Sequence, residues 1–211
     1  MTIILNKPPK SARKAKGDGH MRRAEILEAA ERIFVAEGYE RATIRKIADE
    51  VGVSSTALYM HFTDKDQILL EICIQTMEQL LGINSEISAR PIDSVARVRM
   101  MLEAYVRFAL DNPNAYRLVF CSSPVAASLR KQETTNEIGA ACFDRFVGVV
   151  REIAAEGRLR QGDARTAAQA LWSACHGLVA LMITKPDFDW APADELMRVL
   201  IDSLLHGLIE D

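Results

Sequence analysis

Short hydroxyls, a threonine methyl and a phenol gather in residues 54–61, the run SSTALYMH. On a helical wheel of about 100° per residue the run divides into a small side that packs and a free polar side. The packed side holds Ala57, Leu58 and His61. The free side holds Ser55, Thr56, Tyr59 and Met60. Such side chains can reach base edges and phosphates when a helix lies in the major groove, so the run predicts DNA recognition. A helical corner with a solvated face is the alternative.

This run is the second of two short helices predicted within residues 43–62, TIRKIADEVGVSSTALYMHF. The apolar residues of the first helix recur at helical spacing and are Ile44, Ile47, Ala48 and Val51. Gly52 supplies the permissive backbone of a helix end, and Ser54 can cap the next helix. One helix ends and another begins within about four residues, which is the layout of a helix-turn-helix.

Catalytic and metal chemistry finds little support in the sequence. Cys175 and His176 are neighbours on a predicted helix, so their side chains point about 100° apart and cannot form a nucleophile and base pair. The histidines lack metal-ligand spacing, and neither G-x-S-x-G nor a phosphate-cradling loop occurs. The scattered cysteines are expected to be buried thiols; they are Cys73, Cys121, Cys142 and Cys175. We therefore expect no enzyme, no cofactor and no metal.

A longer pattern surrounds the helix-turn-helix, from RRAEILEAAERIFVAEGYERAT (residues 22–43) through GVS and LYMHF to FTDKDQILLEI (residues 62–72). This succession resembles the DNA-binding domain of the TetR family of transcriptional regulators. The resemblance covers about fifty residues. It implies an all-helical homodimer that binds a palindromic operator in double-stranded DNA, usually as a repressor. It also implies release by a small-molecule effector, here unknown, held in the C-terminal domain.

The resemblance and the wheel together give the predicted DNA-binding residues. They are Thr43, Ser54, Ser55, Thr56, Tyr59, Met60, His61 and Lys65. Base contacts are assigned to Ser55, Thr56 and Met60, although Ser55 stands where the family often has lysine or arginine. Phosphate contacts are assigned to Thr43, Tyr59, His61 and Lys65. For Lys65 the reason is that the family's matching lysine contacts the operator backbone. Thr43 could instead serve only as a helix cap, and His61 could pack at the edge of the core.

The chain is expected to divide into a basic disordered arm (residues 1–20), a helix-turn-helix domain (21–67) and a C-terminal effector-binding and dimerisation domain (68–211). Residues 1–65 carry a net charge of +3 and residues 66–211 carry −6. Positive charge therefore concentrates at the end that would meet phosphates. The arm could track phosphates or be an inert tail. No signal peptide and no run approaching about 18 uncharged apolar residues is apparent, so a cytoplasmic protein without membrane contact is expected.

About nine helices are expected. Beyond the helix-turn-helix they span residues 22–37, 64–85, 91–111, 112–120, 125–156, 163–185 and 192–209, with Thr63 expected to cap the second of these. In the family the last two helices pair across a four-helix dimer interface, and an ordinary intramolecular core is the alternative. Aromatic and apolar residues in the C-terminal domain could line an effector pocket. These are Tyr105, Phe108, Tyr116, Phe120, Phe143, Phe146, Trp172, His176 and Met182, with Arg107 or Arg117 as a possible anchor for an acid.

Residues Trp172, His176 and Gly177 also match a short W-x-x-x-HG pattern of one TetR C-terminal subgroup. The predicted function is thus a DNA-binding regulator released by a ligand. The alternative is a helical ligand-binding or adaptor protein without sequence-specific DNA binding.

Overall fold

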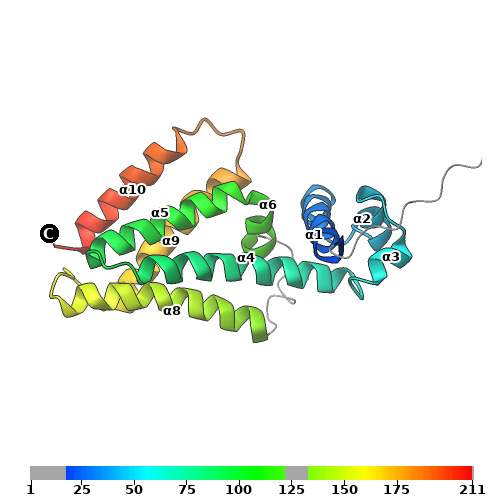
Figure 1. Cartoon of the computed structure of the whole chain (residues 1–211). Helices are drawn as coiled ribbons and strands as arrows, with labels where there is room; N and C mark the ends of the chain where they lie inside the picture. The colour runs from blue at the N-terminus through cyan, green and yellow to red at the C-terminus, as the bar shows by residue number, and fades with distance from the viewer. Residues whose placement is uncertain (1–17, 122–132, 211) are drawn as a thin grey trace, which may run out of the picture.

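A computed structural model describes residues 18–121 and 133–210, and these residues form helices without a β-strand (Figure 1). The elements are α1 (Asp18–Glu37), α2 (Ile44–Glu50), α3 (Ser55–Tyr59), α4 (Lys65–Ser88), α5 (Ser94–Asp111), α6 (Pro113–Tyr116), η1 (Arg117–Cys121), α8 (Glu133–Ala155), α9 (Ala164–Thr184) and α10 (Ala193–Leu208). The expected all-α class is confirmed, with nine α-helices and a π-helical segment in these ranges.

Helices α1, α2 and α3 form a small head whose turns use the residues that the sequence singled out. Gly38 ends α1 at φ 85° and Gly52 ends α2 at φ 68°, backbone angles that glycine adopts without a Cβ clash. The Thr43 hydroxyl accepts from Lys46 N at 3.2 Å, and Ser54 Oγ accepts from Ala57 N at 3.1 Å, so both predicted caps are confirmed. Helix α1 begins at Asp18, four residues earlier than expected.

Helix α4 joins the head to the rest of the molecule as one continuous rod (Figure 1). Its cap is Asp64, which accepts from Gln67 N at 2.7 Å, rather than the expected Thr63. Thr63 instead donates its N–H to Gln67 Oε1 at 2.7 Å. The helix reaches Ser88, three residues beyond the expected end, because apolar positions up to Ile87 stay buried.

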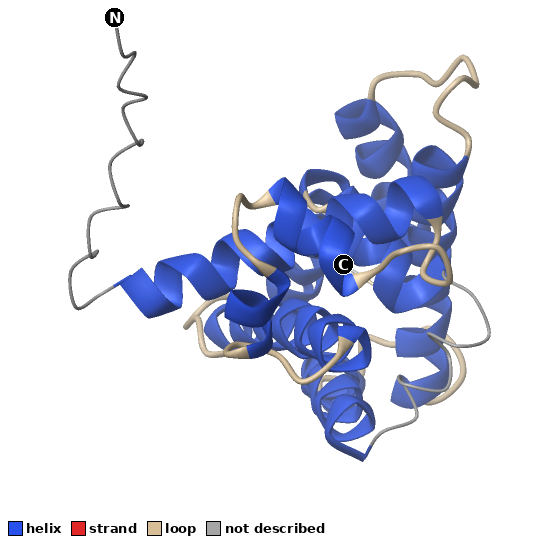
Figure 2. Cartoon of the chain, turned by 90° about the vertical axis from the view of Figure 1, so that its right-hand side faces the viewer, coloured by secondary structure: helices blue, strands red, loops and turns tan. Residues whose placement is uncertain are grey.

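The body is a bundle in which α4 packs on α8 and α5, and α8 and α5 pack on α9. Figure 2 shows the chain as helices joined by loops. Helix α10 covers α9 and α5. Helix α5 begins at Ser94 rather than at Pro91, because Asp93 caps it by accepting from Val95 N and Ala96 N. The expected helix over residues 125–156 is observed from Glu133, and residues 125–132 lie outside the described ranges, as does most of the expected basic arm.

Helix α9 is long and apolar enough, by length and composition alone, to cross a membrane, with a mean hydropathy of 1.3. The expectation that no run approaches the length and composition of a membrane span therefore needs correction. Its apolar side packs into the bundle through Leu171, Cys175 and Val179, which are fully or almost fully buried, and core helices of globular proteins show the same composition. Cys73, Cys142 and Cys175 are buried as expected, whereas Cys121, the last residue of η1, is exposed, contrary to the expectation.

Candidate DNA interface and effector cavity

Helix α3 presents the polar edge that the wheel predicted. Leu58 is fully buried against the head core, whereas Tyr59 is 55% exposed and Met60 is 83% exposed. Ser54 and Thr56 are exposed, and Ser55 is half-buried. The free side of the wheel is therefore largely open to solvent.

Lys65, the first residue of α4, is half-buried and forms hydrogen bonds to the loop before α2. Its ammonium group donates to the carbonyls of Tyr39 at 2.9 Å and Ala42 at 3.4 Å, and it lies 4.2 Å from the centroid of the Tyr39 ring. An ammonium group has three N–H donors, so one remains available for a phosphate. Tyr39 is buried against Phe34.

His61 is half-buried at the end of the recognition segment, and its position is held through the backbone. Its carbonyl accepts from Arg23 of α1 at 2.5 Å. The same guanidinium forms a fork with Glu71 of α4 and lies 4.1 Å above the ring of Phe62. Arg23 therefore ties α1, the end of α3 and α4 together. We did not assign it a role from the sequence, although it belongs to the motif that carries the family resemblance.

Arg45 on α2 is another residue that our reading of the sequence did not single out. Its side chain is largely exposed, and its contact with Asp49 is long at 3.9 Å. Thr43, two residues earlier, is also exposed. A cation this close to a helix N-terminus with an exposed threonine suits the approach of a phosphate backbone.

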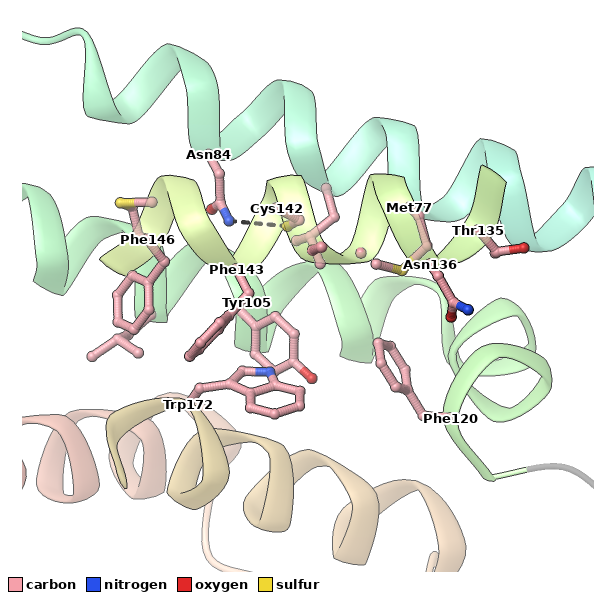
Figure 3. Close-up of a pocket in the computed structure, with 15 residues that line it drawn as sticks. Met77, Asn84, Tyr105, Phe120, Thr135, Asn136, Cys142, Phe143, Phe146 and Trp172 are labelled. Carbon is pink, nitrogen blue, oxygen red and sulfur yellow. Dashed lines mark hydrogen bonds between the residues drawn. The ribbon is translucent and has the colours of Figure 1, made fainter. Parts of the chain in front are cut away.

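A cavity of about 320 Å³ lies in the body between α4, α5, α8 and α9 (Figure 3). Its volume is within the range of about 300–1,000 Å³ of small-molecule sites. Five of the aromatic residues named from the sequence line it: Tyr105, Phe120, Phe143, Phe146 and Trp172. The remaining lining consists of Met77, Leu80, Asn84, Met101, Leu102, Thr135, Asn136, Gly139, Ala140 and Cys142. The apolar members recur at helical spacing, but that spacing does not distinguish a cavity wall from a filled core.

Tyr116 and His176 lie behind the cavity wall, linked to it through Tyr105. The hydroxyl groups of Tyr105 and Tyr116 each lie 2.8 Å from Nδ1 of His176. Burial raises the pKa of Tyr105 to about 12, raises the pKa of Tyr116, and lowers the pKa of His176. All three shifts favour neutral groups, so the wall is a low-dielectric surface with a hydrogen-bonded polar cluster behind it.

Two other predicted lining residues, Phe108 and Met182, are not part of this wall. Phe108 instead lines a separate, more polar cavity of about 330 Å³ between α1, α4, α5 and α6. Arg107 is exposed on α5, and Arg117 donates to the carbonyl of Ile183. Neither arginine lines the first cavity, so the hypothesis of an arginine anchor there has no support from the described residues.

Two known protein families match this chain, one in the head and one in the body. Residues 26–72 match the family of bacterial regulatory proteins named after TetR, and residues 98–208 match the tetracyclin repressor-like C-terminal domain. The nucleoid occlusion factor SlmA of Vibrio vulnificus is 32% identical over 142 residues, which cover 67% of this chain and 70% of SlmA.

Two solved structures share the fold. The TetR family transcriptional regulator PfmR of Thermus thermophilus superposes with a TM-score of 0.71 at 24% identity, covering 86% of this chain and 97% of PfmR. The fatty acid degradation regulator FadR of Bacillus halodurans gives a TM-score of 0.74 at 18% identity, covering 91% of this chain and 97% of FadR. Family and fold are those of DNA-binding regulators rather than enzymes. The chain belongs to the TetR family.

Proposed function

We propose that this chain is a cytoplasmic, homodimeric transcriptional repressor that leaves a palindromic operator when a small molecule enters the cavity of the body. The observation that carries the proposal is the continuity of α4. This helix begins with Lys65 in the head and contributes Met77, Leu80 and Asn84 to the cavity wall. Lys65 and Asn84 are thus about 28 Å apart on one rigid element, at 1.5 Å per residue.

The proposed mechanism follows from this geometry. Two copies of α3 would enter successive major grooves about 34 Å apart. A ligand that binds better to a body in which the two α4 helices have moved apart would favour that arrangement, and both half-sites could then no longer be contacted together.

Exposed apolar side chains on the last two helices support the proposed dimer. Leu181 of α9 is 51% exposed and Val199 of α10 is 57% exposed. Both residues lie in the two helices that pair across the interface in this family. Pairing would remove these apolar side chains from water, which is favourable by about 25 cal/mol per Å² of apolar surface buried.

Nucleoid occlusion is the second candidate, because SlmA carries that name and is 32% identical to this chain. A factor that acts on the nucleoid would bind DNA at many chromosomal positions, whereas a local repressor would bind few. Mapping of the genomic fragments that the purified protein selects separates the two.

The direct test is fluorescence anisotropy of the purified full chain with DNA from beside its own coding region and with scrambled DNA of equal length. We expect a dimer in solution and tighter binding to the first DNA. A monomer, or equal affinity for the two DNAs at low ionic strength, would argue against the proposal.

A further inference from the structure

The cavity of the body has a lining that discriminates between ligand classes. Among the described residues that form it there is no charged side chain, and most are apolar. Burial raises the pKa of the Cys142 thiol in the cavity wall to about 11. Burial also raises the pKa of the Tyr105 phenol to about 12. Surroundings that disfavour a thiolate and a phenolate also disfavour a carboxylate or ammonium group on a ligand, because nothing in this lining offsets its loss of water.

Two polar residues of the wall lack part of their hydrogen bonding. Asn84 and Thr135 are each only 7% exposed, and Asn84 Oδ1 and Thr135 Oγ1 have no hydrogen-bond partner among residues 18–121 and 133–210. Buried polar groups are paired in the great majority of cases, so such exceptions need an explanation. Both residues line the cavity, so the explanation we favour is that a bound ligand supplies the missing partner.

Asn84 has the clearer geometry of the two (Figure 3). Its amide nitrogen donates to Cys142 Sγ at 3.3 Å, a weak bond that leaves the other end of the amide unpaired. Amide oxygen and nitrogen can exchange places by rotation about a broad terminal torsion. In either orientation one amide atom stays unpaired, and a hydroxyl group can satisfy it because a hydroxyl both donates and accepts.

The rest of the cavity sets the shape of the ligand. In the view of Figure 3 the rings of Tyr105, Phe120, Phe143 and Trp172 lie below, whereas Met77 and Asn84 approach from α4 above. Thr135 precedes Cys142 by seven residues on α8, so it lies about 10 Å along the helix from the Asn84 contact. The surface between them, at Gly139 and Ala140, is apolar.

Resting on the proposed function, we propose that the effector is an uncharged, largely apolar ring compound whose hydroxyl group bonds the Asn84 amide. The possible arginine anchor for an acid has no part in this proposal, because neither Arg107 nor Arg117 lines the cavity.

The test compares three probes of one ring system, 2-naphthol, naphthalene and 2-naphthoate, by equilibrium dialysis against the full chain at pH 7. We expect 2-naphthol to bind about fivefold to tenfold more tightly than naphthalene, the worth of one net hydrogen bond. The charged 2-naphthoate should bind at least about tenfold more weakly than 2-naphthol.

The Asn84→Leu variant keeps the side-chain size and removes the amide. It should lose the preference for 2-naphthol over naphthalene and bind naphthalene at least as well as wild type. Thr76→Val is the matched control, because Thr76 is also buried on α4 but its hydroxyl already donates to Ile72 O at 2.7 Å. If Asn84→Leu does not fold, Asn84→Ala serves the same purpose.

Three outcomes overturn the inference: tightest binding of 2-naphthoate, an unchanged preference in the Asn84 variants, or binding of none of the probes. Anisotropy with operator DNA is measured on the same samples. If the wild-type chain binds DNA but does not prefer 2-naphthol over the other two probes, the ligand class alone is refuted, whereas absence of DNA binding refutes the proposed function itself.

Discussion

The hydroxyl of Tyr116 in α6 and Nδ1 of His176 in α9 lie 2.8 Å apart, with the Tyr105 hydroxyl of α5 at the same distance from Nδ1. The rings of Tyr116 and His176 also pack, with centroids 5.5 Å apart. Three helices therefore meet at one imidazole. A neutral imidazole can accept a hydrogen bond from a phenol at Nδ1, whereas imidazolium cannot, so the charge of His176 affects how these helices pack.

His176 makes the stability of the body depend on pH. Burial lowers the pKa of His176 in the folded chain, so the unfolded chain binds a proton at higher pH than the folded chain does. Stability should be fully present above the unfolded pKa of about 6.5 and fall as the pH is lowered below it. Urea unfolding from pH 7.5 to 5 measures this effect. His176→Gln, which can still accept a phenol hydrogen bond, should flatten the curve, and an equally steep curve would contradict the assignment.

Lys65→Met should weaken binding to all DNA sequences, because it removes a charge without base specificity. The slope of the logarithm of affinity against the logarithm of salt concentration should fall by about one, the value of one phosphate contact. Its bonds to Tyr39 O and Ala42 O would be lost as well, so melting of the variant must be measured in parallel. Lys185→Met, at the far end of α9, is the control. Equal affinities of wild type and Lys65→Met across a salt titration would remove Lys65 from the contact set.

Thr56→Ala should change sequence preference rather than overall affinity, because Thr56 is exposed on α3 and its hydroxyl and methyl are proposed to read base edges. A selection from randomised operators should show relaxed preference at one base pair of each half-site, worth about 1–3 kcal/mol. A uniform loss over all sequences would instead assign Thr56 to the phosphate backbone.

Arg23→Lys should destabilise the head, because an ammonium group cannot reproduce the fork to Glu71 together with the bond to His61 O. We expect a loss of about 1–2 kcal/mol in unfolding free energy. A double-mutant cycle with Glu71→Gln isolates the pair. Additive losses in that cycle would show that the two side chains do not act together.

Val199→Glu should convert the proposed dimer to a monomer, because it places a charge on an exposed apolar position of α10. Sedimentation velocity measures the mass directly. Ile92→Glu is the matched control, since Ile92 is also exposed and lies in the turn between α4 and α5. A dimeric Val199→Glu protein would place the interface elsewhere.

The helix-turn-helix could be read from the sequence because its determinants are local. Thr43 and Ser54 cap the next helices through bonds to an N–H three residues on, and Gly38 and Gly52 permit the backbone angles at which helices end. The polar edge of α3 follows from a wheel of eight residues, and Tyr59 and Met60 are exposed as that wheel requires.

The cavity depended on contacts between helices far apart in the chain. An aromatic residue at helical spacing is equally compatible with a filled core and with a cavity wall, so Phe143 and Tyr116 looked alike in the sequence although only Phe143 lines the cavity. The Asn84 amide nitrogen donates to Cys142, 58 residues away, whereas its oxygen has no partner among the described residues. Local backbone chemistry thus determined the fold class and the helix-turn-helix. The packing of α4 against α5, α8 and α9 decided which side chains line the cavity and which of their polar atoms have no partner among the described residues.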